Sequence, residues 1–203
     1  MTQPTTVFVV DDDEAMRHSL EFLLKSLGNP VKSFASAEDF LSAWQPDQPG
    51  CLVLDVRMPG MGGLDLQRRL NEHAAQLAIV FISGHGDIPM VVRAMRAGAI
   101  DFLEKPFNDQ MLLDRVTAGL RLSTEACARA VRTRLVQGRV ESLTAREREV
   151  MMLVAQGKPN KVIAFELDIS IKTVEVHRAH VMEKMGAANV AELTLMLVEV
   201  GQA

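Results

Sequence analysis

The sequence predicts two domains: an α/β domain built on a doubly wound, five-stranded parallel sheet, and after it an all-α domain of four helices. Over the first 120 residues, five short apolar runs alternate with helical periodicity, which is typical of a parallel sheet covered by helices on both faces. Residues 1–119 carry 10 Lys and Arg against 16 Asp and Glu, whereas residues 120–203 carry 12 against 10. We therefore predict an α/β domain at 1–120, a helical linker at 121–140 and a helical domain at 141–203, with different partners for the two domains.

The composition is typical of a globular protein and gives no sign of a membrane span or a disulfide framework. The 203 residues are 48% hydrophobic, which is enough for two small cores. No apolar run is long enough to span a membrane, and Met1–Thr6 is a short polar tail without a signal-peptide pattern. Cys51 and Cys127 lie far apart and indicate neither a disulfide framework nor a metal site. We expect a cytoplasmic protein with no membrane partner.

Strands and helices alternate along the first domain. Apolar or β-branched runs predict the strands, and apolar residues at spacings of three and four predict the helices. The expected strands are 7–10, 31–34, 52–55, 79–83 and 101–103. The expected helices are 16–27, 36–44, 64–70, 87–99 and 112–120. Ser36 and Asp87 are expected to begin two of these helices, Gly28 to stop the first, and Gly62-Gly63 to form a loop.

Polar side chains stand at the ends of four strands: Asp11 and Asp12, Asp55, Ser83 and Lys105. The carboxyl ends of parallel strands share one edge of a sheet, so these side chains are expected to converge. Singly, Asp55 is a cap, a metal ligand or a nucleophile. The acidic run at 11–14 either complements a helix dipole or binds a divalent cation. Together they predict phosphoryl transfer, in which carboxylates hold Mg²⁺, the lysine offsets negative charge and Asp55 attacks phosphorus.

The first domain resembles the receiver domain of bacterial response regulators. The resemblance rests on Asp11-Asp12, Asp55 followed by Met58-Pro59-Gly60, Ser83, Phe102 and Lys105-Pro106. It implies that Asp55 accepts phosphate from a sensor histidine kinase and that Lys105 contacts the phosphoryl oxygens. It also implies a cis peptide bond before Pro106.

The same resemblance implies a cofactor and a switch. Mg²⁺ would be held by Asp12, Asp55 and the backbone carbonyl of Arg57, with Asp11 acting through water. Ser83 and Phe102 would form the switch, in which the hydroxyl moves toward the phosphate and the ring turns inward. Taken by themselves, Ser83 also fits a strand-end cap and Phe102 a core ring. His85 fits a loop residue and receives no catalytic role.

The second domain contains a predicted helix-turn-helix. Thr144 and Glu147 have the spacing of a capping box, which begins a helix that ends at Gly157. Further helices are expected at 160–167, at 173–182 after Ser170 as N-cap, and at 192–200. On the core side of the third helix we expect Val174, Val181 and Met185. The residues expected to be exposed are Lys172, Glu175, Val176, Ala179 and, as an open alternative, His180.

This domain resembles the LuxR/GerE-type DNA-binding domain. The matching residues are Leu143-Thr144, Arg146-Glu147, Gly157, Asn160-Lys161, Ile163-Ala164, Ser170, Thr173-Val174, His177 and Lys184. The resemblance implies that the third helix enters the major groove, where base edges would be approached by Lys172, Glu175, Val176 and Ala179. The rest of the predicted DNA-binding set is Asn160 and the phosphate contacts Lys161, Thr173 and Arg178. His177 is either buried and structural or a contact.

The two resemblances together make the chain similar to the FixJ/NarL class of response regulators. The run Gly84-His85-Gly86-Asp87-Ile88-Pro89, followed by Ala97-Gly98-Ala99, points to the FixJ-like branch. The arginine-rich linker has three interpretations. It is a solvated helix with a broken or flexible end near Gly138, a basic stripe that contacts nucleic acid, or a helix that pairs with a partner in dimerisation.

The function we expect is transcription regulation controlled by phosphorylation. The phosphorylated receiver would dimerise, with Val92 and Arg96 as interface candidates from helical spacing, and bind promoter DNA as an activator, with RNA polymerase as a further partner. An inhibited monomer is a compatible variant. We expect no enzyme activity beyond self-phosphorylation from small donors and self-dephosphorylation. The alternatives are a phosphate sink or interaction switch that binds no promoter, and a phosphatase that cycles through Asp55.

Overall fold

The computed structural model describes residues 5–46, 48–84 and 86–201. The chain divides into two compact units between Ala128 and Arg129, and each unit is described by itself. Most of the predicted polar tail (residues 1–4) and His85 of the loop motif lie outside the described residues. Within the described part of the chain, no helix combines the length and the apolar character needed to cross a membrane.

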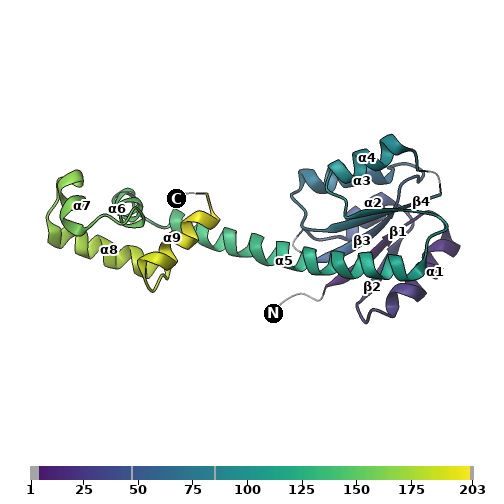
Figure 1. Ribbon diagram of the computed structural model, residues 1–203, viewed down its shortest axis with the longest axis horizontal. Helices are drawn as coiled ribbons and strands as arrows, with labels where there is room; N and C mark the ends of the chain where they lie inside the picture. The colour runs from purple at the N-terminus through teal and green to yellow at the C-terminus, as the bar shows by residue number, and fades with distance from the viewer. Residues whose placement is uncertain (1–4, 47, 85, 202–203) are drawn as a thin grey trace. The chain divides into compact units, whose positions relative to one another are not determined.

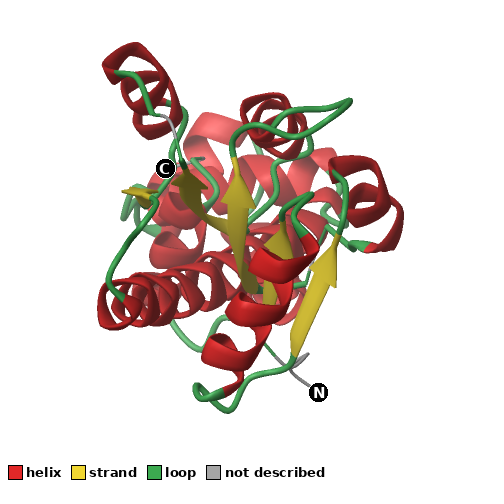
Figure 2. Ribbon diagram, turned by 90° about the vertical axis from the view of Figure 1, so that its right-hand side faces the viewer, coloured by secondary structure: helices red, strands yellow, loops and turns green. Residues whose placement is uncertain are grey.

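A five-stranded parallel sheet forms the centre of the first unit, as predicted (Figures 1 and 2). The strands lie in the order β2-β1-β3-β4-β5, and every neighbouring pair is parallel. Their bounds are β1 Thr6–Val10, β2 Val31–Phe34, β3 Gly50–Asp55, β4 Ala78–Ser83 and β5 Asp101–Glu104. The three central strands are buried along their whole length. This burial on both faces is why their sequences are largely continuous apolar runs rather than alternating patterns.

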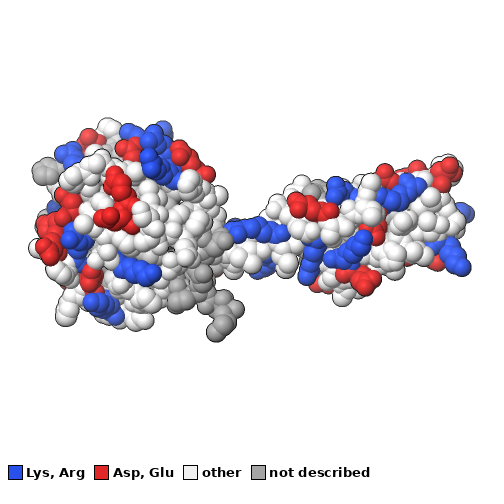
Figure 3. Space-filling view, turned by 180° about the vertical axis from the view of Figure 1, so that it is seen from behind, with Lys and Arg blue, Asp and Glu red and all other residues white. Residues whose placement is uncertain are grey.

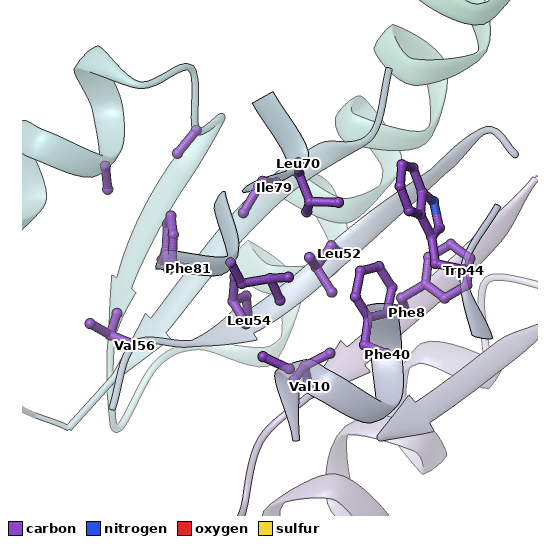
Figure 4. Packing of buried hydrophobic residues seen from close by; sticks show 14 residues of the cluster. Phe8, Val10, Phe40, Trp44, Leu52, Leu54, Val56, Leu70, Ile79 and Phe81 are labelled. Carbon is purple, nitrogen blue, oxygen red and sulfur yellow. The ribbon is translucent and has the colours of Figure 1, made fainter. Parts of the chain in front are cut away.

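Helices cover both faces of the sheet, again as predicted. They are α1 Glu14–Lys25, α2 Ala37–Ala43, α3 Gly63–Glu72, α4 Ile88–Arg96 and the first part of α5 Asp109–Glu141. Helices α2, α3 and α4 cover the face that carries Phe8, Leu54 and Phe81 (Figure 4). Helices α1 and α5 cover the opposite face, which carries Val9 and Val53. Alternate residues of each buried strand therefore fill two separate cores.

Helix α5 runs without interruption through Gly138, so the predicted break near this residue is wrong. Glycine in a helix interior costs about 1 kcal/mol relative to alanine. Val136 and Val140, on either side of Gly138, are both buried in the core of the second unit. Their burial outweighs the local preference of glycine, and it continues the helix to Glu141.

The second unit contains the four predicted helices and the end of α5. The four are α6 Ala145–Ala155, α7 Asn160–Leu167, α8 Ile171–Met185 and α9 Val190–Glu199. Helix α8 extends beyond the expected 173–182 at both ends, from directly after its N-cap Ser170 to the predicted core residue Met185, and α9 begins earlier because Asn189 caps it. Val150, Ile163 and Val174, each from a different helix, meet in one core.

The helix starts predicted from capping residues are confirmed. Ser36 and Asp87 accept hydrogen bonds from the backbone N–H groups of Asp39 and Met90, and Ser170 caps α8 in the same way. The capping box at α6 is complete, with both reciprocal bonds between Thr144 and Glu147 present. Such caps satisfy backbone donors that have no partner within the helix, so short polar signals fix where each helix begins.

Candidate functional site

The sheet topology brings two carboxylates together. Strands β1 and β3 are neighbours, with Val10 paired to Leu54, although they are not consecutive in the chain. The direction of winding reverses between them, and open α/β sheets bind their ligands at such a point, beyond the carboxyl ends of the strands. Asp11 directly follows β1, and Asp55 is the last residue of β3. Both side chains therefore stand at the position where this fold places its chemistry.

Lys105, which follows β5, joins these two carboxylates. Its Nζ lies 2.8 Å from Asp11 Oδ2 and 2.7 Å from Asp55 Oδ1. The side chains are 19%, 1% and 9% exposed for Lys105, Asp11 and Asp55, so the group is largely shielded from water. Asp55 Oδ2 also accepts a hydrogen bond of 2.7 Å from the backbone N–H of Arg57. The predicted convergence of Asp11, Asp55 and Lys105 is present in the structure.

Burial and ion pairing determine the pKa values of Asp55 and Lys105. Burial is the largest influence on the Asp55 carboxyl and raises its pKa, whereas the hydrogen bond and the charge of Lys105 act to lower it; the net result is a raised pKa. Burial alone lowers the pKa of the Lys105 ammonium, but its hydrogen bonds to Asp11 and Asp55 reverse this, so its pKa is raised. Lys105 therefore stays charged at neutral pH, as the bridge between two acids requires. The raised pKa of Asp55 reflects chiefly its removal from water, and the neighbouring Asp11 carboxylate adds a smaller effect in the same direction.

In the acidic loop, residues 11–13, one carboxylate has no hydrogen-bond or ion-pair partner among the described residues. Asp13 uses its side chain to cap α1, and its backbone N–H donates to Asp11 Oδ1 at 2.9 Å. Asp12 is exposed, and its carboxylate has no hydrogen-bond or ion-pair partner among the described residues. No cluster of three or more His, Cys, Asp or Glu in the described chain is already gathered for a metal. The oxygen donors of Asp11, Asp12 and Asp55 are nevertheless the type that Mg²⁺ prefers, so the residues fit this ion.

The two predicted switch residues lie on neighbouring strands. Ser83 ends β4 and is buried, and its backbone carbonyl accepts a hydrogen bond of 2.8 Å from the Lys105 N–H. Phe102 lies in β5, where its ring stacks on Phe81 with 6.1 Å between the ring centroids. A Cβ added at Gly86 would come within 2.7 Å of the Phe102 ring, so only glycine allows the ring this position. The peptide bond between Lys105 and Pro106 is cis.

The sequence predicts Gly63 to lie in a loop, but the structure gives this residue a different role. Gly63 is the first residue of α3, and its N–H donates to the carbonyl of Val56 at 3.0 Å. A Cβ on Gly63 would lie 2.3 Å from the backbone oxygen of Asp55, a distance that no side chain tolerates. The absence of a side chain therefore lets α3 begin directly against the end of β3 and fixes the strand end that carries Asp55. The pair of glycines after the strand is the signal that could have indicated this contact.

Helix α4 presents the predicted interface residues on its surface. Val92 and Arg96 are both exposed and one turn apart, so they share a face of the helix. Ile88 and Met95 are also exposed, at 80% and 40%. Exposed apolar side chains on one helix are typical of a surface that contacts another protein.

In the second unit, α7 and α8 form the predicted helix-turn-helix. Val174, Val181 and Met185 are buried on the core side of α8. The predicted base-reading residues are all exposed, namely Lys172, Glu175, Val176 and Ala179. Lys161 and His180 are exposed as well, and Thr173 is half-buried and bonded to Ser170. On the face seen in Figure 3, basic and acidic side chains are mixed over this unit rather than separated.

Two predicted DNA contacts bond to each other. Arg178 Nη1 donates to Asn160 Oδ1 at 3.0 Å, which ties α8 to the start of α7. His177 is half-buried, and its Nδ1 is a buried nitrogen without a hydrogen-bond partner in the described structure. Lys161, Lys172 and Glu175 have no side-chain partner among the described residues, so their charges are available to a ligand.

Exchanges at two of these positions are expected to affect DNA binding differently. Lys161 is expected to contact a phosphate, so Lys161→Ala should lower affinity for every duplex and reduce the slope of log K against log salt by about 1. Glu175 is expected to approach a base edge, so Glu175→Gln should change base preference by about 1–3 kcal/mol at one base pair. The measurement is fluorescence anisotropy at several salt concentrations, with duplexes that the wild type selects from a random pool. Lys25→Ala is the control: it removes the same charge from α1, in the first unit, and should change neither the salt slope nor the base preference. A Glu175→Gln variant with unchanged base preference would contradict the predicted base contact of Glu175.

A buried acid stabilises the second unit. Glu147 Oε2 accepts hydrogen bonds from Lys184 Nζ at 2.7 Å and from the Thr144 N–H at 2.9 Å, and its side chain is 5% exposed. Lys184 first, and then the Thr144 bond, lowers the pKa of the Glu147 carboxyl from 4.5 to about 2. The carboxylate is thus preferred in the folded state, and α6 is joined to α8 through it.

The lowered pKa predicts how the stability of this unit depends on pH. The contribution of Glu147 is fully present above about pH 4.5 and is lost as pH falls toward about 2. Glu147→Gln should therefore lower the thermal midpoint of the second unit at pH 7 and make little difference near pH 2. The only tryptophan, Trp44, lies in the first unit, so its fluorescence follows that unit alone, whereas circular dichroism follows both. Glu149→Gln, an exposed acid on the same helix, is the control, and an equal effect of both substitutions at pH 7 contradicts the prediction.

Comparison with known proteins supports the assignment of both units. The model of the response regulator receiver domain matches residues 7–117, and that of bacterial regulatory proteins of the luxR family matches residues 141–197. The chain is 46% identical over 203 residues to the transcriptional regulatory protein FixJ of Azorhizobium caulinodans, covering 100% of this chain and 96% of FixJ. It is 45% identical over 189 residues to the response regulator protein TodT of Pseudomonas putida, covering 93% of this chain and 83% of TodT.

A solved structure is similar over both units. The low-resolution structure of the response regulator StyR is 48% identical and aligns with a TM-score of 0.85, covering 97% of this chain and 99% of StyR. Both domains are thus matched in sequence and in fold. The chain belongs to the two-component response regulators with a LuxR-type DNA-binding domain, and it is a transcription regulator of the FixJ-like branch.

Proposed function

We propose that Asp55 is the phosphoryl acceptor and that its phosphorylation by a sensor histidine kinase, with Mg²⁺ beside it, switches this regulator. The observation that carries the proposal is the bridge of Lys105 Nζ to Asp11 and Asp55, at 2.8 and 2.7 Å. Two largely buried carboxylates that share one lysine stabilise a fold less than well-packed apolar side chains in their place would. Such a group is therefore expected where function requires it. The group also stands at the point where the winding of the sheet reverses.

The chemistry is the transfer of one phosphoryl group. A carboxylate oxygen of Asp55 attacks the phosphorus of a phosphohistidine on the kinase, a bond from oxygen to phosphorus forms, and the bond from phosphorus to imidazole nitrogen breaks. Asp12, Asp55 and the Arg57 carbonyl would hold Mg²⁺, with Asp11 acting through water, and the ion would neutralise charge on the phosphoryl oxygens. Lys105 already touches Asp55, so it needs little movement to contact those oxygens. The chain acts here as an acceptor rather than as an enzyme with turnover on other substrates.

The switch would connect this site to the surface of α4. In the proposed mechanism, the Ser83 hydroxyl moves toward the phosphate and the Phe102 ring turns inward, leaving the space beside Gly86. The surface formed by α4, β5 and the start of α5 then pairs with a second copy, through residues that include Val92 and Arg96. Two DNA-binding domains thereby act on one two-fold operator. We propose that the dimer activates transcription together with RNA polymerase in the cytoplasm; an inhibited monomer before phosphorylation is compatible with this mechanism.

Sedimentation velocity tests the proposed switch. Wild type and Asp55→Asn are compared with and without Mg²⁺ and beryllofluoride, which mimics a phosphoryl group. A monomer-to-dimer shift in the wild type alone is the expected result. Absence of a shift in both proteins overturns the dimer mechanism, and an equal shift in both overturns the role of Asp55. Dimerisation without any sequence-preferring DNA binding would favour a phosphate sink or interaction switch instead.

A further inference from the structure

Arg17 holds the backbone of the acidic loop from outside the loop. Its Nη1 donates hydrogen bonds to the carbonyl oxygens of Asp11, at 2.9 Å, and Asp12, at 3.0 Å. These carbonyls belong to consecutive residues, so one guanidinium nitrogen fixes both peptide groups. Arg17 is half-buried, and it lies one turn into α1 after the N-cap Asp13.

The placement of Arg17 opposes the usual electrostatic preference. The N-terminus of a helix carries partial positive charge, so a cation that folds back toward it is normally unfavourable. Hydrogen bonds from a charged group to two carbonyls offset this cost, as does the acidic run beside it. A side chain held against its preference indicates that the geometry of the loop matters.

The other contacts of the loop leave one carboxylate for a ligand. Asp11 accepts bonds from Lys105 and from the Asp13 N–H, and Asp13 is committed to the cap of α1. Asp12 has no side-chain partner among the described residues. Apart from its own rotamers, the placement of this carboxylate thus depends on the backbone to which Arg17 is bonded.

We propose that Arg17 is a positioning residue for the divalent cation, which it serves through the backbone of Asp11 and Asp12 without touching the ion. The proposal rests on the proposed function, because it assumes that these carboxylates bind Mg²⁺. Groups that orient metal ligands typically change metal affinity when they are removed, by tenfold or more in tightly held sites.

The sign of the effect separates this role from simple electrostatics. Arg17 is a positive charge near a cation site, so its removal should tighten cation binding if charge repulsion were its only influence. A positioning role predicts weaker binding instead, because an acidic loop that Arg17 no longer holds must be ordered each time the ion binds. Weaker binding after loss of a positive charge is thus opposite in sign to what repulsion alone predicts, and the loop resonances and the Arg68→Met control separate it from a general structural effect.

The test measures the affinity of the full chain for Mn²⁺, used in place of Mg²⁺, by the electron paramagnetic resonance signal of the free ion. Arg17→Met removes both bonds and the charge, whereas Arg17→Lys keeps the charge but not the planar donor group. Arg68→Met is the matched control, since Arg68 is an exposed arginine on α3 with no contact to the acidic loop. The amide resonances of Asp12 and Asp13 in the cation-free protein report the loop itself.

The expected result is a dissociation constant at least about threefold higher in Arg17→Met, a smaller rise in Arg17→Lys, shifted loop resonances in both, and no rise in Arg68→Met. Unchanged or tighter binding in Arg17→Met, with Mn²⁺ still bound by the wild type, overturns the positioning role alone. A wild type that binds no Mn²⁺ overturns the cation site of the proposed function and this proposal with it. If Arg17→Met does not fold, Arg17→Lys provides the test. A raised dissociation constant for Mn²⁺ in Arg17→Lys supports the proposal, and an unchanged one overturns it.

Discussion

Asp55→Asn is expected to take up no phosphoryl group from acetyl phosphate and Mg²⁺, whereas the wild type takes up one. An amide oxygen is a poor nucleophile, so incorporation should fall at least about 100-fold, which corresponds to about 2.7 kcal/mol in the barrier. Intact-protein mass spectrometry over time measures the change. The fold should survive, because the substitution removes one of two neighbouring carboxylates and leaves Lys105 bonded to Asp11.

Asp13→Asn is the control for the acceptor. Asp13 lies in the same acidic run, but its side chain caps α1, and asparagine caps helices equally well. This variant should be phosphorylated at close to the wild-type rate. Labelling of Asp55→Asn as fast as the wild type would place the acceptor on another carboxylate and remove the basis of the switch.

Lys105→Met is expected to destabilise the cation-free first unit by about 3 kcal/mol at neutral pH, because two buried carboxylates are left facing each other. The pKa of Asp55 is already raised by burial, and without Lys105 it should rise further. A carboxyl whose pKa is raised in the folded state costs stability as pH rises through that pKa, so the destabilisation should shrink in acid. Urea unfolding followed by Trp44 fluorescence measures the first unit, since this buried residue is the only tryptophan.

Two further variants identify the cause of this loss. The double variant Lys105→Met/Asp55→Asn should recover much of the stability, because it removes one of the two unpaired charges. Lys25→Met is the control: this lysine is 63% exposed and pairs with Glu21 at 3.6 Å, so its loss should cost less than about 0.5 kcal/mol. Mg²⁺ should stabilise Lys105→Met more than the wild type. Equal costs for Lys105→Met and Lys25→Met would contradict the account of the bridge.

Strand ends and helix caps were predictable from the sequence because their signals are local. A buried parallel strand needs a continuous apolar run, and its last residue is therefore easy to locate, as for Asp55 and Ser83. Once the strands are parallel, their ends must share one edge, so the meeting of Asp11, Asp55 and Lys105 follows from topology alone. The helix-turn-helix was similarly visible in the caps at Thr144 and Ser170 and in the buried spacing of α8.

Contacts that depend on distances between separate segments were not predictable. The contact of Gly63 with the Asp55 carbonyl and that of Arg17 with the acidic loop require coordinates, since neither residue type signals its partner. The bond between Arg178 and Asn160 likewise joins two residues for which the sequence predicts contacts with DNA. At Gly138 a local preference misled the prediction, because packing of Val136 and Val140 outweighs it.

The most direct test of the central claim is the affinity of the full chain for a selected promoter duplex, measured by fluorescence anisotropy with and without Mg²⁺ and beryllofluoride. We predict that the mimic tightens binding of the wild type at least about tenfold, or about 1.4 kcal/mol, and leaves Asp55→Asn unchanged. Equal affinities of the wild type in both conditions, at matched salt, would contradict the claim that chemistry at Asp55 controls the DNA-binding domain.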